Sequence, residues 1–208
     1  MEDDVTSPGT TPEEVGGWWH SIDLPSGRTA GHKTADHLAA ELASLDLPGL
    51  SGKSVLDIGA WDGFYSFTAE RLGAARVVSL DHHVWGASPS LQARWEEYVA
   101  GGAGAYQDFW DMPDALDLVG LPGRGHYERA HRELESAVEP VVGDFMTMDL
   151  EALGSFDVVL FLGVLYHLKH PLYGLQRLRS ITNDVAVIET EAVVGSAAGA
   201  HRVLLKRS

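Results

Sequence analysis

Residues 54–63, with the sequence SVLDIGAWDG, restrict the fold more than any other part of the chain. The short segment over residues 54–58, with Val55, Leu56 and Ile58, predicts a buried strand, and the glycines after it predict a tight turn. We expect a helix over residues 64–72, which Gly73 ends, and a second strand over residues 76–80, followed by Asp81. A strand, turn, helix and strand in this order form a right-handed crossover unit, which predicts a parallel sheet.

Strands and helices continue to alternate along the chain. A third strand is expected at residues 140–142, a further strand at 185–189, and helices at 33–45 and 172–181. Residues 156–162 are almost wholly apolar, which is typical of a parallel strand covered on both faces. The pattern therefore predicts the α/β class with a doubly wound sheet.

The length of 208 residues fits one sizeable α/β core. Residues 1–17 are acidic and rich in Ser, Thr and Pro, which predicts a flexible tail, so that residues 18–208 form the single domain. No apolar run approaches the roughly 20 residues of a membrane helix. The start of the chain also lacks the basic and apolar regions of a secretory signal, so we expect no membrane partner and a cytoplasmic location.

A long segment, residues 82–139, separates the second and third expected strands, although one helix would make the crossover. Such a surplus is usually a lid or binding element, so we expect this insertion to cover a pocket for an apolar or aromatic molecule. The alternative is a helical insertion whose rings form a small core of their own. The rings expected to enclose the bound molecule are Trp85, Trp95, Tyr106, Trp110 and Tyr127.

Charge and residue usage exclude several kinds of chemistry. The formal net charge of -15 argues against a nucleic-acid partner, because affinity for nucleic acids comes largely from neutralised phosphates. The chain has no cysteine, which excludes disulfides, thiolate metal sites and cysteine nucleophiles. It has ten histidines, but none has a carboxylate pattern such as HExxH around it, so no metal site is predicted.

The glycine turn predicts a site for S-adenosyl-L-methionine. Asp57 suits a cationic amino group, and Asp81 at the end of the next strand suits the two hydroxyls of a ribose. A dinucleotide is disfavoured, since the middle glycine of its fingerprint is replaced by Trp61 and the anionic Asp62 follows. A turn that serves packing alone is the other alternative. The cofactor-binding residues predicted from these two strand ends are Asp57, Gly59, Trp61, Gly63, Asp81 and His82.

Two later segments also follow strand ends, where open α/β sheets bind ligands. Asp144 is expected to accept a hydrogen bond from an adenine amino group, with Phe145 packing on the ring; the alternative for Asp144 is an ordinary helix N-cap. Gly163 is expected to border the cofactor, with Tyr166 and His167 facing the cleft. His167 is the candidate base for the acceptor, and the alternative is a histidine that fixes the loop by hydrogen bonds.

Residues 57–66 and 163–171, the latter with the sequence GVLYHLKHP, resemble the tRNA wobble-uridine carboxymethyltransferases and related uridine methyltransferases. The segment WWHSID at residues 18–23 is similar to the stretch that precedes the fold in such proteins. The resemblance implies a class I, Rossmann-like methyltransferase sheet with strand order 3-2-1-4-5. Since only residues 201–207 remain as a strand candidate near the end, we expect at most one added edge strand, and an exposed edge that favours a homodimer.

The resemblance also implies roles for individual residues. Gly59 and Asp81 would hold the methionine and ribose parts of the cofactor, and Asp144 the adenine. Tyr166 matches a tyrosine that helps hold the extra carboxylate of carboxy-S-adenosyl-L-methionine in the tRNA enzymes, and Lys33 matches a lysine of that site. Those enzymes also use a cation from the C-terminal part of the fold, for which this chain has no clear counterpart, so plain S-adenosyl-L-methionine is the predicted cofactor.

The sequence thus predicts methyl transfer to an oxygen or nitrogen atom of a small-molecule acceptor. The cofactor supplies the electrophile, while the protein supplies orientation, exclusion of water and a base. Two alternatives remain open: a tRNA wobble-uridine methyl- or carboxymethyltransferase, and a cofactor-binding protein without catalytic activity.

Overall fold

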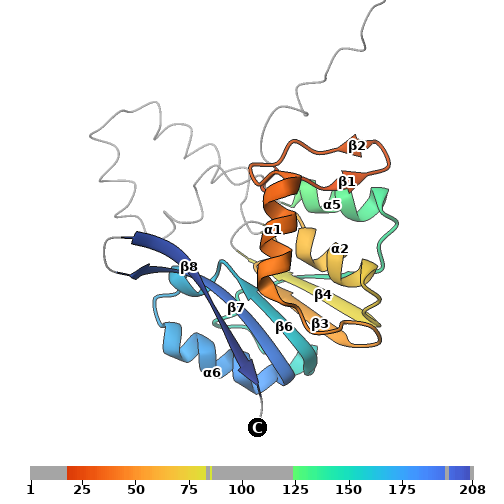
Figure 1. Cartoon of the computed structure of the whole chain (residues 1–208). Coiled ribbons are helices and arrows are strands. Elements are labelled where there is room, and N and C mark those ends of the chain that lie inside the picture. Colours follow the sequence, from red (N-terminus) through yellow and green to blue (C-terminus); the bar gives the residue numbers. More distant parts are fainter. Residues whose placement is uncertain (1–17, 83–84, 86–123, 195–196, 207–208) are drawn as a thin grey trace, which may run out of the picture.

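The computed structural model describes residues 18–82, 85, 124–194 and 197–206, and its centre is a six-stranded sheet (Figure 1). Along the sheet the strand order is β5-β4-β3-β6-β7-β8. The first five strands are parallel, and β8 is antiparallel to β7. The strands are β3 (Ser54–Ile58), β4 (Arg76–Asp81), β5 (Glu139–Val142), β6 (Phe156–Leu162), β7 (Thr182–Val194) and β8 (Ala197–Lys206).

This topology confirms the predicted order 3-2-1-4-5 with one added edge strand. The structure differs from the prediction in the length of β7, which continues well beyond residue 189. The reason is the antiparallel partner, because β8 pairs with β7 from Val185 to Val194, beyond the point where the pairing with β6 ends at Glu189.

Helices cover both faces of the sheet (Figure 1). On one face lie α1 (Ala35–Leu45), α2 (Phe64–Arg71) and α5 (Gly125–Glu133), and on the other lies α6 (Pro171–Ile181). Neighbouring strand residues divide between two hydrophobic clusters: Val55 packs with the residues beneath α2 and α5, whereas Leu56 packs with those of α6. Burial on both sides explains why β6 is apolar at almost every position.

The N-terminal part of the domain contains an element that the sequence pattern does not predict. Two short strands, β1 (Asp23–Leu24) and β2 (Gly27–Arg28), pair in a hairpin with Pro25 and Ser26 at its turn. The hairpin lies beside α5 (Figure 1), where the amide of Ser26 donates to the carboxylate of Glu133 at 3.3 Å. Two 3-10 turns complete the described elements, η3 (Glu151–Leu153) and η4 (Leu165–His167).

Some predictions concern residues outside the described ranges. The expected flexible tail, residues 1–17, and most of the expected lid, residues 83–84 and 86–123, are among them. The described sheet has two outer strands, β5 on one side and β8 on the other. Either one could be the exposed edge of the predicted homodimer. Within the described residues, no helix combines the length and the apolar character that a membrane crossing demands.

Candidate cofactor and transfer site

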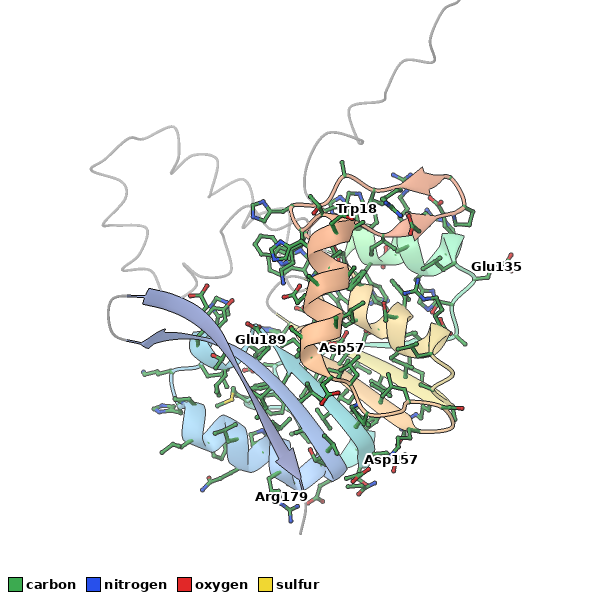
Figure 2. The ribbon with its side chains drawn as sticks, viewed as in Figure 1. Trp18, Asp57, Glu135, Asp157, Arg179 and Glu189 are labelled. Atoms are coloured by element: carbon green, nitrogen blue, oxygen red, sulfur yellow. The ribbon has the colours of Figure 1, made fainter. Side chains whose placement is uncertain are left out.

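The carboxyl ends of the parallel strands bring most of the predicted site residues to one edge of the sheet. Ile58 is in register with Leu80 of β4 and with Phe161 of β6, so the segments that follow these three residues lie side by side. In Figure 2, Asp57 and Glu189 lie at this edge, while Asp157 lies at the opposite end of the strands. The structure therefore brings together the glycine loop, Asp81 and Gly163, as predicted.

The loop after β3 is fixed by the neighbouring strand ends. Gly59 has φ +79°, a conformation that favours glycine, and a Cβ atom there would lie 2.6 Å from Cγ2 of Val164. The amide of Gly59 donates to the carbonyl of Leu80 at 2.8 Å. Trp61 also has positive φ, and its amide donates to Oδ2 of Asp81 at 2.9 Å. Asp81 therefore holds the loop against the end of β4. The sequence predicted a ribose contact for Asp81 but not this hydrogen bond to the loop.

The loop carries a polar atom that fits a bound cofactor. The indole Nε1 of Trp61 is buried and, within the described part of the chain, has no hydrogen-bond partner. An unpaired buried donor costs roughly 1–3 kcal/mol, so an acceptor group of a ligand would stabilise it. The cofactor carries such an acceptor in its carboxylate and carries positive charge in its sulfonium and amino groups. The carboxylates of Asp57 and Asp81 suit those positive charges.

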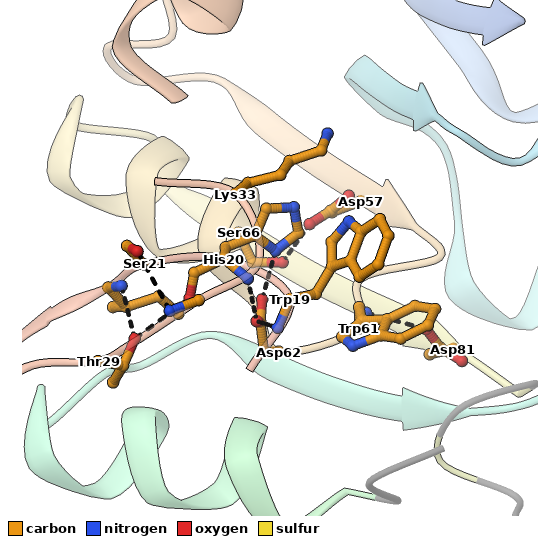
Figure 3. Close-up of polar contacts among 12 residues, drawn as sticks. Trp19, His20, Ser21, Thr29, Lys33, Asp57, Trp61, Asp62, Ser66 and Asp81 are labelled. Atoms are coloured by element: carbon orange, nitrogen blue, oxygen red, sulfur yellow. Dashed lines mark hydrogen bonds and ion pairs between the residues drawn. The ribbon is translucent and has the colours of Figure 1, made fainter. Parts of the chain in front are cut away.

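Asp57 ends a buried chain of hydroxyl groups. Tyr127 Oη donates to Ser79 Oγ at 3.2 Å, and Ser79 donates to Ser66 at 2.6 Å. Ser66 in turn donates to Oδ2 of Asp57 at 2.6 Å (Figure 3). Burial raises the pKa of Asp57 to about 6, although the hydrogen bond from Ser66 and the nearby His20 oppose the rise. Because Asp57 is only 2% exposed, we expect it to act on a cation at the loop through its charge rather than by open contact.

Asp62 anchors the segment that precedes the fold over the glycine loop. Its carboxylate accepts the amides of Trp19 at 3.0 Å and His20 at 2.8 Å, and its Oδ1 lies 2.6 Å from Nδ1 of His20 (Figure 3). Asp62 is fully buried. The Trp19 ring lies 5.4 Å from that of Trp61, so the two indoles lie together above the loop. In the sequence, Asp62 indicates only that a pyrophosphate is disfavoured, because its anchoring role depends on residues more than 40 positions away.

Asp144 and Phe145, the predicted adenine contacts, both have partners within the chain. Asp144 accepts the amide of Met146 at 2.7 Å and the hydroxyl of Thr147 at 3.0 Å, so it caps its own turn, which was the alternative interpretation. The ring of Phe145 is buried in the core and lies 5.4 Å from that of Phe161. The core beside α6 therefore takes up most of this ring, and its contact with a cofactor stays a prediction.

Tyr166 and His167 lie in η4 at the predicted edge, and both side chains are exposed. Their rings are 4.1 Å apart. The buried part of the Tyr166 ring loses water, which raises its pKa, and the carboxylates of Glu191 and Glu189 raise it further. His82, directly after β4, is likewise exposed. The base role of His167 stays a prediction.

Three carboxylates near this edge were not predicted from the sequence to be part of the site: Glu41, Glu189 and Glu191. Lys33, which the resemblance places at a carboxylate site, forms an ion pair with Glu41, with Nζ 2.7 Å from Oε1. Burial raises the pKa of Glu189, as do Glu41 and Glu191, while Lys33 and the amide of Gly163 lower it. The only sequence signal for Glu189 is its place at the end of an apolar run.

Two rings of the predicted lid are in fact part of the domain core. Tyr127 of α5 is 1% exposed and stacks with Phe67 of α2 at 5.3 Å, so it does not line a cleft. Trp85 is also buried, and its Nε1 donates to the carbonyl of Trp61 at 2.7 Å. The other rings assigned to the lid lie outside the described residues.

A groove of about 550 Å³ opens elsewhere, between the β1–β2 hairpin, α1 and α2. None of the predicted site residues lines it. Its wall is mixed in character, with Leu38 and Phe67 beside Glu70 and Arg71. The groove therefore belongs to the helical side of the domain and is separate from the glycine loop.

Comparisons with known proteins agree with this fold. No family model matches the chain. Over 135 residues the chain is 28% identical to the tRNA U34 carboxymethyltransferase of Campylobacter hominis, covering 65% of this chain and 34% of that protein. It is also similar to the crystal structure of EvdMO1, with a TM-score of 0.53 and 19% identity over 89% of this chain and 34% of that one. For the N-terminal domain of EvdMO1 with SAH bound, the TM-score is 0.50 and the identity 20%, over 86% and 62% of the two chains.

The chain thus spans 34% of the length of the tRNA enzyme and of the EvdMO1 chain that it matches. The sheet order and the similarity to the EvdMO1 structures confirm the predicted doubly wound, Rossmann-like fold. SAH is the form of S-adenosyl-L-methionine that remains after methyl transfer, so the predicted cofactor agrees with the ligand of that N-terminal domain.

Asp62→Ala is expected to free the N-terminal segment from the glycine loop. Loss of one partner from a buried pair costs roughly 3–5 kcal/mol, because the remaining polar groups stay buried without partners. Hydrogen exchange at the amides of Trp19 and His20 should accelerate, and the free energy of unfolding in urea should fall by that amount. Asp23→Ala is the matched control, since Asp23 pairs with Arg28 at the surface and its loss should cost less than about 1 kcal/mol. Slow exchange at both amides in Asp62→Ala would contradict the anchoring role.

Asp57→Asn is expected to change how stability depends on pH. The folded protein holds the Asp57 proton up to a pKa of about 6, whereas the unfolded chain releases it near 3.8. Unfolding therefore releases this proton between these values, and the contribution of Asp57 to stability falls as pH rises from about 4 to 6. An asparagine side chain cannot ionise, so the variant should gain stability relative to the parent over that range in urea unfolding.

Asp157→Asn is the control with the opposite sign. Hydrogen bonds from the amide and hydroxyl of Ser54 lower the pKa of Asp157, so its contribution to stability is present at neutral pH and is lost as pH falls through the lowered pKa. This variant should therefore lose stability relative to the parent as pH rises from acid to neutral. If both differences run in the same direction with pH, the assignment for Asp57 is wrong.

Proposed function

We propose that this protein is a methyltransferase that transfers the methyl group of S-adenosyl-L-methionine to a small-molecule acceptor. The observation that carries the proposal is the glycine loop at the carboxyl ends of β3 and β4, held by Asp81 in a fold shared with an SAH-bound domain. When bound, the cofactor supplies the electrophilic methyl group. The protein binds and orients the two reactants, excludes water and receives the proton of the acceptor.

The described residues suggest how the cofactor would lie. The loop from Gly59 to Gly63 would contact the methionine part, with the free indole N–H of Trp61 as a donor. Asp81, at the end of β4, would meet the ribose, and Asp144 would lie toward the adenine. Gly163, at the end of β6, leaves space beside Tyr166, where the acceptor would approach. His167 is the candidate base from the sequence.

The charge of the chain supports a small-molecule acceptor. The formal net charge is -15, whereas tRNA binding depends largely on cations that neutralise phosphates. At the transfer edge itself, Lys33 is paired with Glu41, and Glu189 and Glu191 add negative charge nearby. The second candidate is transfer to a tRNA wobble uridine, which the similarity to the tRNA U34 carboxymethyltransferase favours. A homodimer through an exposed sheet edge is part of the same proposal.

Calorimetric titration with SAH tests the cofactor site. The parent protein should bind SAH, and Asp81→Ala should weaken binding by roughly 1–3 kcal/mol, because the loop loses the acceptor for the Trp61 amide and the ribose loses its partner. Asp184→Ala is the matched control, because Asp184 pairs with Lys53 at the opposite end of the strands. This variant should bind SAH as tightly as the parent protein does. Absence of SAH binding by the parent protein would overturn the proposed function.

A tRNA titration separates the two kinds of acceptor. Unmodified bulk tRNA should bind weakly and with little dependence on salt, because few phosphates would be neutralised. In a metabolite extract, label from the cofactor methyl group should pass into products that a small-pore filter does not retain. Micromolar tRNA binding with a steep salt slope, together with label retained in tRNA, would favour the tRNA enzyme instead.

A further inference from the structure

Glu189 borders the space where the acceptor would approach. The backbone amide of Gly163 donates to the carbonyl of Glu189 at 3.1 Å, which joins the ends of β6 and β7. A side chain built at Gly163 would begin 3.9 Å from Oε2 of Glu189 and 3.7 Å from Oη of Tyr166. Because residue 163 is glycine, this space is left open between a carboxylate and a phenol. Figure 2 shows Glu189 at the same end of the sheet as Asp57.

The groups around Glu189 make this space negative. Lys33, from the N-terminal segment, is the nearby cation, and its ammonium is already paired with Glu41 of α1 at 2.7 Å. Glu191 adds a further carboxylate from β7, and Tyr166 of η4, whose pKa is raised by the same carboxylates and by partial burial, adds no positive charge. With three carboxylates and one lysine, the described surroundings favour a cation and repel an anion.

Half-burial gives Glu189 a second property that a base requires. Removal of water and the carboxylates of Glu41 and Glu191 raise its pKa, so its carboxylate holds a proton more readily than an exposed glutamate does. A base whose pKa lies closer to the working pH is more effective in proton transfer. The pairing of β7 with β6 also places the carboxylate of Glu189 beside Gly163. Glu189 therefore has both the position and the raised pKa that a base at this site requires.

We propose, on the basis of the methyl transfer proposed above, that Glu189 binds the acceptor as an ammonium group and then takes its proton, so that the acceptor is an amine. In this step the N–H bond of the ammonium breaks, its electron pair stays on nitrogen, and the proton moves to Oε2 of Glu189. The nitrogen pair then forms the new bond to the methyl carbon, and the carbon–sulfur bond breaks with its electrons passing to sulfur. The product leaves as a methylated ammonium, and Glu189 releases its proton to water.

Sinefungin provides a test that needs no identified acceptor. In this analogue an uncharged carbon replaces the sulfur of S-adenosyl-L-methionine, and a primary amine replaces the transferred methyl group. SAH has the same adenosine and amino acid parts but lacks that amine. The ratio of the two dissociation constants therefore reports how the protein treats an ammonium group at the point of transfer. We expect the parent protein to bind sinefungin at least tenfold more tightly than SAH at pH 7.5.

Glu189→Gln should abolish most of this preference and leave SAH affinity within about threefold of the parent. Glu151→Gln is the matched control, because Glu151 lies in η3 near the start of β6 and should keep the full preference. The preference of the parent should also fall on acidification, starting above the pH at which an ordinary glutamate titrates, while that of Glu189→Gln stays flat. Such a pH profile would not arise from a purely structural role of Glu189.

Two failures are distinguishable. If the parent protein does not bind SAH, the proposed function itself is wrong. If SAH binds but the parent shows no sinefungin preference, or if Glu189→Gln keeps the preference, the assignment of an ammonium site to Glu189 is wrong while the cofactor site remains.

Discussion

The parallel pairing of β3 with β4 and β6 is the constraint on which the site depends. The carboxyl ends of parallel strands lie at the same edge of a sheet. The segments that follow β3, β4 and β6 therefore meet there, although they are far apart in the sequence. Each strand is buried on both faces, and this burial holds the backbones in register. The glycine loop therefore starts from a rigid base, and the amide of Trp61 finds Asp81 at a fixed position on the next strand.

Buried carboxylates then determine the arrangement above that edge. Asp62 has enough hydrogen bonds to offset the loss of water, so a fully buried anion is tolerated and the N-terminal segment is held over the loop. Asp57 has the hydroxyl of Ser66 but remains deprived of solvent, which is why its pKa rises rather than falls. A cationic cofactor at the loop would relieve that cost, so the same residue that lowers the stability of the free protein near neutral pH would favour binding.

The sequence was sufficient for those elements whose signals are local. The strand over residues 54–58 and the strand over residues 156–162 match the structure because a mainly apolar run of this length depends chiefly on burial. The full length of β7 was not predictable, since it depends on pairing with β8. The β1–β2 hairpin has only two residues in each strand, too few to give an alternating pattern. The positions of Gly59 and Asp81 at the sheet edge could be predicted from spacing, whereas the anchoring role of Asp62 and the surroundings of Glu189 depend on tertiary contacts. Phe145 shows the converse: its position after a strand suggested a ligand contact, but the core beside α6 buries the ring.

The pairing of Lys33 with Glu41 bears on which cofactor the edge suits. The resemblance to the tRNA carboxymethyltransferases places Lys33 and Tyr166 where they would hold an extra carboxylate. In this structure the lysine ammonium is 2.7 Å from a carboxylate of the same chain, and Glu189 and Glu191 lie beside Tyr166. The extra carboxylate of such a cofactor would have to compete with Glu41 for the ammonium of Lys33. It would also approach the carboxylates of Glu189 and Glu191, each of which repels it. A methyl group carried on a sulfonium meets no such repulsion, and its positive charge is attracted instead. The electrostatics of the edge therefore argue for S-adenosyl-L-methionine without the additional carboxylate.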